Sequence, residues 1–369
     1  MWHRLIIVFA AIALASCAGR PEIVSLPASQ SATDIEPVFL ATSRKRTDQG
    51  FSSERSSELS FARFDVSVPQ DRQPGSVPFA ENAPDSRRHF LVAGTENFSG
   101  GSDFQAALRQ AQANRPPGQR ELVVYVHGYN NTFAQSLYRA AQIRYDFDVP
   151  GLAVHYAWPS LESVTGYVYD RDSVLAARES FERFLQLLVQ TTDERIIVLA
   201  HSMGSYLTME TLRSLSIDQD RVTLRGIGGV VLMSPDIDVQ VFQAQARRID
   251  PLPNPFIIFT SQNDRALRLS ATVSRQSQRL GNIGTVDDVS DFNVTIIDLT
   301  QISDAGDQLN HSVGLSSPSL IQFVRNAPQL GEQLEDDQVA GADEVPGTVN
   351  VVRGARQIVL APLDAVLGR

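Results

Sequence analysis

The segment IIVLAHSMGS, residues 196–205, decides the fold that this sequence predicts. Its apolar start, Ile196–Leu199, is typical of a buried strand, and a helical pattern follows the segment directly. Between the two stands Ser202, with the small residues Ala200 and Gly204 two positions before and two after it. A sharp turn from strand to helix strains its central residue and leaves no room for larger side chains at those positions. The segment therefore predicts a turn that exposes a nucleophilic serine, and a serine that only caps the helix is the alternative.

Apolar runs and helical patterns alternate around this segment. Most of the runs are apolar throughout, as strands covered on both faces must be. This alternation predicts an α/β fold with a mostly parallel central sheet and helices on both faces. Three upstream runs should extend the same sheet, and Asp172 is a candidate cap for the second helix. The predicted strands are 38–40, 61–68, 90–92, 122–126, 152–156, 196–199, 230–233, 256–259 and 294–297, and the predicted helices are 133–145, 174–188, 205–215, 239–247 and 318–324.

A serine becomes a strong nucleophile only when a base removes its proton, so a histidine oriented by a carboxylate is required. In the α/β-hydrolase fold these two groups follow the serine in the order acid, histidine. Asp264 follows the strand over 256–259, and His311 follows the strand over 294–297. Loops at the carboxyl ends of parallel strands gather at one edge of the sheet. We therefore expect Ser202, Asp264 and His311 to form a catalytic triad.

Other residues compete for these roles. Asp236 and Asp238 also follow a predicted strand and could supply the carboxylate, although aspartate is common in turns and helix caps as well. His201 adjoins the serine, but successive side chains around a turn point in different directions, so we expect it to order the turn. His155 lies inside a strand, which favours a core histidine. His311 is the strongest candidate for the base.

Acyl transfer also requires hydrogen-bond donors for the oxygen that becomes negatively charged. The backbone N–H of Met203, directly after the nucleophile, is the first expected donor, and the second should come from a loop after an earlier strand. Gly128 and Tyr129 directly follow the strand over 122–126, and we expect the N–H of Tyr129 to be that donor. A plain turn is the alternative. This chemistry needs no metal and no organic cofactor.

The amino terminus predicts export. Arg4 precedes the apolar run Leu5–Leu14, and small residues then lead to Cys17, which is typical of a signal peptide over residues 1–16. The sequence before the cysteine resembles the bacterial lipoprotein cleavage box, in which the cysteine is acylated and becomes the first mature residue. An incidental cysteine is the alternative. We expect a lipid anchor at Cys17 in the cell envelope, and Ala18 favours the outer membrane, facing the periplasm.

Composition and charge limit the remaining possibilities. The 369 residues carry 42 acids and 32 bases, and this net charge of −10 argues against broad binding to nucleic acid. A single cysteine excludes an intrachain disulfide and a cysteine-rich zinc site. We expect a flexible tether over residues 17–36, one hydrolase domain over 37–327, and an acidic linker with an apolar tail over 328–369. The apolar end, 351–367, is expected to pack back on the domain.

Several segments together resemble a bacterial family of esterase/lipase-like α/β-hydrolases whose physiological substrates are largely undefined. The resemblance covers about residues 37–327 and implies Ser202, Asp264 and His311 as the catalytic residues. It would place an aromatic residue where this chain has Val313, and Trp158 is expected to line the site or to pack. The matching segments are VFLATSRKR (38–46), FARFDVSVP (61–69), VVYVHGYNNTF (123–133), AWPS (157–160), AHSMGS (200–205), SPDID (234–238), SQNDRAL (261–267) and HSVGLSSP (311–318).

These observations predict a lipid-anchored serine hydrolase that cleaves small-molecule or lipid carboxylic esters through an acyl-enzyme. A peptidase or an acyltransferase would use the same triad, and the sequence does not separate these activities. A non-catalytic envelope scaffold on a hydrolase fold, with the tail as its contact, is a further alternative.

Overall fold

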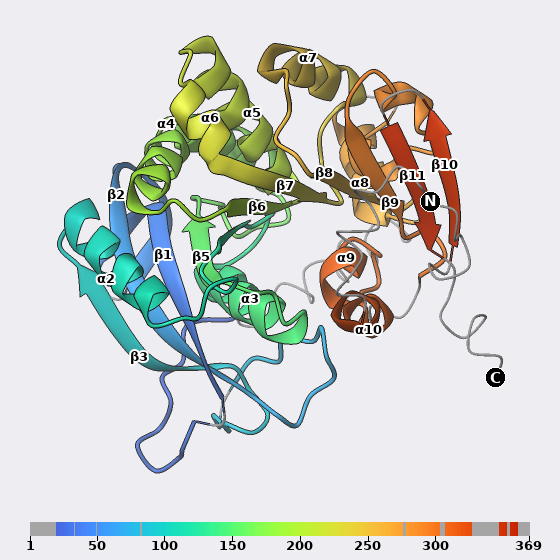
Figure 1. The fold of residues 1–369 in the computed structure, drawn as a ribbon. Coiled ribbons are helices and arrows are strands. Elements are labelled where there is room, and N and C mark those ends of the chain that lie inside the picture. Colours follow the sequence, from blue (N-terminus) through green and yellow to red (C-terminus); the bar gives the residue numbers. More distant parts are fainter. Residues whose placement is uncertain are drawn as a thin grey trace.

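The computed structural model describes residues 20–326, apart from 33, 49, 82, 276–277 and 303–306, together with 347–352 and 355–360. Its strands are β1 (Asp34–Thr47), β2 (Gly50–Val68), β3 (Leu91–Phe98), β4 (Leu122–Val126), β5 (Leu152–Ala157), β6 (Ile196–His201), β7 (Ile227–Met233), β8 (Phe256–Thr260), β9 (Val294–Asp298), β10 (Gly347–Val352) and β11 (Ala355–Leu360). They form one sheet in the order β10-β11-β9-β8-β7-β6-β4-β5-β1-β2-β3 (Figure 1). Neighbours from β11 to β1 pair in parallel, and β10, β2 and β3 add antiparallel edges. The predicted α/β fold is confirmed.

Helices cover both faces of this sheet. They are α2 (Gly101–Ala113), α3 (Phe133–Asp146), α4 (Tyr167–Thr191), α5 (Met203–Ile217), α6 (Arg221–Gly226), α7 (Val239–Ile249), α8 (Arg265–Val273), α9 (Val313–Ser316) and α10 (Pro318–Asn326). In Figure 1, α4, α5, α6 and α7 lie above the sheet, and α3, α9 and α10 lie below it. None of the helices in the described part of the chain has the length and apolar character needed to cross a bilayer.

Alternate residues of each strand face opposite layers, because successive side chains of a strand point to opposite faces. On β4, Leu122, Val124 and Val126 enter one buried cluster, which also contains residues of α4, α5 and α7. Tyr125 enters the second cluster, with residues of α3 and α9. The central strands are apolar throughout because both clusters need their side chains.

The sequence located the central strands well and the helices less completely. All six predicted strands from 122 to 297 are present, and the three upstream runs belong to the same sheet as longer strands. The proposed cap at Asp172 is wrong, since α4 begins at Tyr167 after Gly166. Helix α2 was not predicted, because only Phe104, Leu108 and Gln112 of its mostly polar sequence are buried.

The folded domain extends beyond the predicted range 37–327 in both directions. Backbone hydrogen bonds join Val24 and Leu26 to Val92, the second residue of β3. At the other end, β11 pairs in parallel with β9, so residues 355–360 of the predicted apolar end belong to the sheet. The predicted signal peptide, Cys17 and the acidic residues 332–344 lie outside the described residues, and the lipoprotein interpretation stays a prediction.

Candidate active site

Ser202 occupies a strained turn at the carboxyl end of β6. Its backbone has φ 53° and ψ −121°, a conformation that non-glycine residues rarely adopt and that proteins retain mainly at functional sites. The N–H of Ser202 donates to the carbonyl of Met233 at 2.9 Å, and its carbonyl accepts from the N–H groups of Ser205 and Asp236 at 3.0 and 3.2 Å. The side chain makes no capping hydrogen bond to α5, so the helix-cap alternative is not supported.

The small residues around Ser202 are required by close backbone packing. A Cβ atom on Gly204 would stand 2.4 Å from the carbonyl oxygen of His127, which is shorter than any tolerated contact. A Cβ atom on Gly128 would come within 2.9 Å of the Cβ atom of Ser202. Ala200 is buried between β4 and β7. The loop after β4 therefore lies directly against the serine.

The structure brings Asp264 and His311 together. The Nδ1 atom of His311 lies 2.8 Å from Oδ2 of the fully buried Asp264. The other carboxylate oxygen, Oδ1, accepts from the N–H of Leu267 at 2.9 Å, so Asp264 also caps α8. The ring of His311 lies 4.8 Å from the ring of His201, the residue before Ser202, measured between centroids. Residues from the ends of β6, β8 and β9 thus converge at one edge of the sheet.

Three carboxylates act on the protonation of His311. Burial lowers the pKa of its imidazole, but the charge and the hydrogen bond of Asp264, together with two further carboxylates, raise the pKa above the ordinary value of 6.5. Asp236 and Asp307 add to this increase. Asp307 also fixes the loop, because its Oδ2 atom accepts from the N–H groups of His311 and Ser312 at 2.7 and 2.8 Å.

The competing carboxylates have other partners. Asp238 caps α7 by accepting from the N–H groups of Gln240 and Val241. Asp236 forms a buried ion pair with Arg279, with 3.1 Å between Oδ1 and Nε. The hydrogen bond to the histidine is therefore made by Asp264, the residue that the sequence favoured. The buried network around Asp236 was missed, because nothing in the sequence links Arg279 to this segment.

His201 and His155 are both buried, as expected of His155. His201 places Nε2 3.2 Å from the carbonyl oxygen of His311, so it supports the loop that carries that residue. Burial, reinforced by the neighbouring His311, lowers the pKa of His201 to about 3. His155 lies inside β5 with Nδ1 3.0 Å from the carbonyl oxygen of Tyr125. Both rings therefore remain neutral near pH 7.

The loop after β4 is held by its own asparagine. The side-chain amide of Asn131 donates to the carbonyl oxygens of Gly128 and Tyr129 at 3.1 and 2.9 Å. In a trans peptide the N–H points opposite to the C=O, so the N–H of Tyr129 points away from the Asn131 amide. This arrangement suits a backbone donor beside Ser202. Asparagine side chains that bond nearby backbone in turns are the signal that could have identified Asn131.

Trp158 packs behind this loop and does not line the site. Its side chain is fully buried and stacks on the His127 ring, with 4.9 Å between centroids and 6° between planes. The indole N–H donates to the carbonyl of His127 at 2.7 Å. Val313, where the resemblance implied an aromatic residue, is buried as the first residue of α9.

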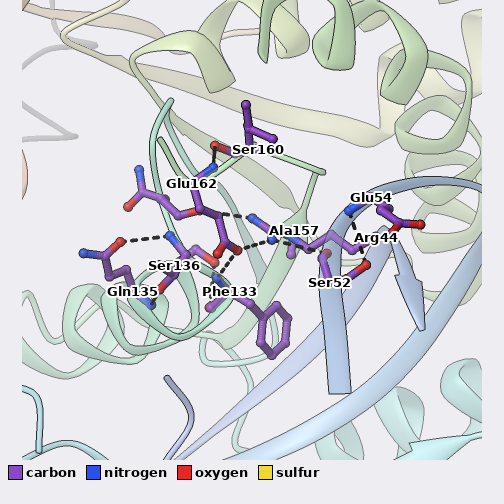
Figure 2. A network of polar contacts seen from close by, with 12 residues as sticks. Arg44, Ser52, Glu54, Phe133, Gln135, Ser136, Ala157, Ser160 and Glu162 are labelled. Carbon is purple, nitrogen blue, oxygen red and sulfur yellow. Dashed lines mark hydrogen bonds and ion pairs between the residues drawn. The ribbon is translucent and has the colours of Figure 1, made fainter. Parts of the chain in front are cut away.

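Arg44 connects the loops after β4 and β5, and Figure 2 shows its guanidinium reaching Glu162. The fully buried side chain donates to Trp158 O and Asn131 O, each at 3.1 Å, and to Oε1 of Glu162 at 2.5 Å. The same Oε1 atom accepts from the N–H of Phe133, the first residue of α3, at 3.2 Å. A buried cation therefore fixes the position of the loop that contains Gly128 and Tyr129.

Arg44→Gln is expected to lower the free energy of unfolding by about 1–3 kcal/mol, because it removes the buried cation that bonds Trp158 O, Asn131 O and the partly exposed carboxylate of Glu162, and leaves these acceptors without their donor. Lys45→Gln is the matched control, since Lys45 pairs with Glu54 on the exposed surface and such pairs add little. Urea unfolding of both variants measures the difference. Equal effects of the two substitutions would contradict the role assigned to Arg44.

Residues 103–327 match the model of a family described as alpha/beta hydrolase of unknown function (DUF900). Among solved structures, the chain is similar to esterase B from Lactobacillus rhamnosis (11% identity over 91% of this chain and 98% of that one, TM-score 0.34). It is also similar to an esterase structure from Rhizomucor miehei (10% identity over 86% of this chain and 95% of that one, TM-score 0.34). A third similar structure is a YdeN-like hydrolase from Pectobacterium atrosepticum (19% identity over 46% of this chain and 80% of that one, TM-score 0.25). At these TM-scores the likeness supports no statement about activity, and no curated protein matches the chain. The family match covers more than half of the 369 residues, and the chain therefore belongs to this family of alpha/beta hydrolases of unknown function.

Proposed function

We propose that this protein is a serine hydrolase that cleaves carboxylic esters through an acyl-enzyme. The observation that carries the proposal is the hydrogen bond between Asp264 and His311 beside the strained Ser202 turn. A strained serine, a histidine and a buried carboxylate, contributed in this chain order, are the components that activate a hydroxyl nucleophile in this fold.

Each residue of the proposed triad has one task. Ser202 Oγ attacks the ester carbonyl while His311 takes its proton at Nε2, because Nδ1 is bonded to Asp264. The tetrahedral intermediate then collapses, and His311 gives the proton to the departing alkoxide, which leaves as an alcohol. Water then attacks the acyl-enzyme while His311 takes a proton from it. His311 returns this proton to Ser202 Oγ as the carboxylic acid is released. Asp264 holds the imidazole in place and stabilises its protonated form.

The N–H groups of Met203 and Tyr129 are proposed to bind the oxyanion. Met203 is the first residue of α5, where the helix dipole favours a negative charge. The loop of Tyr129 is supported by Asn131 and Arg44. Donors that are already fixed before the reaction stabilise the transition state without further reorganisation.

Activity is expected to fall toward acid pH, because only neutral His311 can accept the proton of Ser202. The pKa of His311 is raised, so the protonated and inactive form persists to higher pH than for an ordinary histidine. The rate of labelling of Ser202 by a fluorophosphonate should therefore decline with a midpoint above pH 6.5. A midpoint below 6.5, or a rate that is unchanged down to pH 5, would contradict this assignment of the base.

A screen of carboxylic esters tests the proposed reaction. It should vary the length of the acyl chain and the alcohol, identify both products, and include amides and alternative acyl acceptors. We expect release of acid and alcohol by the wild type and no release by Ser202→Ala. Turnover of amides alone, or transfer of the acyl group to an acceptor other than water, would replace the esterase proposal by a peptidase or an acyltransferase.

The sequence at the amino terminus supports a proposed site of action. Acylation of Cys17 would hold the enzyme in the bacterial cell envelope, in the outer membrane and facing the periplasm. Val24 accepts a backbone hydrogen bond from Val92 of β3 and stands seven residues after Cys17, so such an anchor would keep the hydrolase domain close to a lipid surface.

A further inference from the structure

Five strongly exposed large apolar side chains lie in the segments that follow β5, β8 and β9. Among described residues, Val164 and Val168 are each 69% exposed, Leu269 is 63% exposed and Val273 is 59% exposed. Leu309, at 49%, completes a set that we call the apolar rim. Single exposed apolar residues are ordinary on protein surfaces, but several at one place mark an interaction site.

Hydrogen bonds join the members of the apolar rim through their neighbours. Tyr167, which directly precedes Val168, shares a 2.8 Å hydrogen bond with the hydroxyl of Ser270, the residue after Leu269. The Tyr167 hydroxyl also donates to Asp236 at 3.0 Å, and the N–H of Asp236 donates to the Ser202 carbonyl. The first residue of α4 and Ser270 on the buried side of α8, next to Leu269, therefore meet in a contact that leads to the serine.

The last member of the rim belongs to the His311 loop. The carbonyl of Leu309 accepts from the N–H of Arg265, the first residue of α8, at 2.8 Å. The rim residues follow the carboxyl ends of β5, β8 and β9, and Ser202 follows the carboxyl end of β6. The apolar rim and the candidate active site thus share one edge of the sheet.

The charges on and just after α8 are positive although the whole chain is acidic, while Asp172 on α4 and Asp307 in the His311 loop are acidic neighbours of other rim residues. Arg265, Arg268 and Arg275 are exposed on α8 and just after it, and residues 265–275 contain no acidic residue. Arg268 also donates to the carbonyl of Gln262 at the start of the helix. Leu269 and Val273 lie four residues apart, one turn along the outer surface of the same helix. Exposed leucine and valine beside arginines are typical of helices that lie on anionic membranes.

We propose that the apolar rim and these three arginines dock the protein onto an anionic lipid surface. The apolar side chains enter the boundary of the acyl chains, and the guanidinium groups pair with lipid phosphates. In this orientation Ser202 faces the lipid, and the substrate class would be ester lipids of the membrane. This assignment of the substrate rests on the proposed function. The docking itself needs neither catalysis nor an anchor at Cys17.

Sedimentation with vesicles tests the docking. The chain from Ala18 lacks Cys17 and keeps every residue that the structure describes, and Ser202→Ala in this chain prevents hydrolysis of the vesicles. We expect it to bind vesicles of mixed phosphatidylglycerol and phosphatidylcholine, but not phosphatidylcholine alone. Leu269→Ser with Val273→Ser should weaken binding about tenfold or more. Arg265→Gln, Arg268→Gln and Arg275→Gln together should weaken it about 100-fold at low salt.

Val222→Ser is the matched control, because Val222 is 66% exposed and lies on α6 between two arginines. Helix α6 directly precedes the amino end of β7, so Val222 lies at the edge of the sheet opposite the candidate active site. It should bind vesicles as the parent chain does. The docking proposal is overturned by no binding to anionic vesicles, by equal binding to phosphatidylcholine, or by equal loss in Val222→Ser. A dimer in solution that the Leu269 and Val273 substitutions dissociate, without vesicle binding, would assign the rim to a second copy instead.

The proposed function and the docking fail separately. Ester turnover and labelling of Ser202 are measured in solution without vesicles. Vesicle binding is measured with Ser202→Ala, which cannot hydrolyse esters. An inactive protein that still binds vesicles overturns the proposed function alone, and an active protein that does not bind them overturns the docking alone.

Discussion

Ser202→Ala is expected to lower kcat by about 10⁶-fold, the loss typical of removing the nucleophile of a serine hydrolase. The effect is this large because no other hydroxyl can occupy the strained position of Ser202, with φ 53°, directly after His201, whose ring lies 4.8 Å from the ring of His311. The substitution removes one oxygen atom and leaves the backbone hydrogen bonds of the turn in place. We therefore expect an inactive protein that keeps the wild-type unfolding transition.

The control for this variant is Ser216→Ala, near the far end of the helix that follows Ser202. Ser216 is buried and donates to the carbonyl of Arg248 at 2.7 Å, so its loss tests the removal of a buried hydroxyl by itself. It should cost about 1 kcal/mol of stability and leave ester hydrolysis within a few-fold of wild type. Hydrolysis that survives in Ser202→Ala at a rate near that of Ser216→Ala would exclude Ser202 as the nucleophile.

Asp264→Asn is expected to lower kcat by about 10⁴-fold, because it changes the tautomer of His311. The asparagine oxygen can still accept from the N–H of Leu267 and cap α8. Its amide nitrogen would then face Nδ1 and donate to it, which forces the imidazole proton onto Nε2. A histidine protonated at Nε2 cannot accept the proton of Ser202, so the nucleophile stays inactive.

Asp238→Asn is the matched control, since Asp238 caps the neighbouring helix α7 and does not contact His311. Steady-state hydrolysis of the best ester from the screen should separate the two variants by about the full 10⁴-fold. Asp236→Asn tests the remaining rival, with urea unfolding to account for the loss of the ion pair with Arg279. Full activity of Asp264→Asn, together with a folded and inactive Asp236→Asn, would transfer the role of the acid to Asp236.

The parts of the fold that depend on local patterns could be predicted from the sequence. The central strands are continuous apolar runs because both of their faces are covered, and β4 was located to the residue. The small residues around Ser202 could be recognised because the steric limit arises within a few residues of the turn. Asp264 and His311 could be paired because each follows the end of a strand in a known order.

The parts that depend on distant contacts could not be predicted. Arg44 stands within the segment that carried the resemblance, but its partners Asn131, Trp158 and Glu162 lie 87 to 118 residues away. Arg279 was missed for the same reason, because its ion-pair partner Asp236 lies 43 residues earlier in the sequence (279 − 236). The apolar end of the chain was expected to pack on the domain, but only the structure shows that β11 within it pairs with β9. Such pairings are set by the tertiary fold, and composition and periodicity do not contain them.

The most direct test of the proposed serine chemistry is labelling by a fluorophosphonate, followed by mass spectrometry of the modified peptide. The probe reacts with a serine whose proton is removed by a neighbouring base, and no substrate has to be known. We expect one label, on Ser202, in the folded wild-type protein, and its loss after unfolding in urea and in Asp264→Asn. A folded protein that takes up no label on Ser202, or takes it up on another residue, would contradict the proposed mechanism.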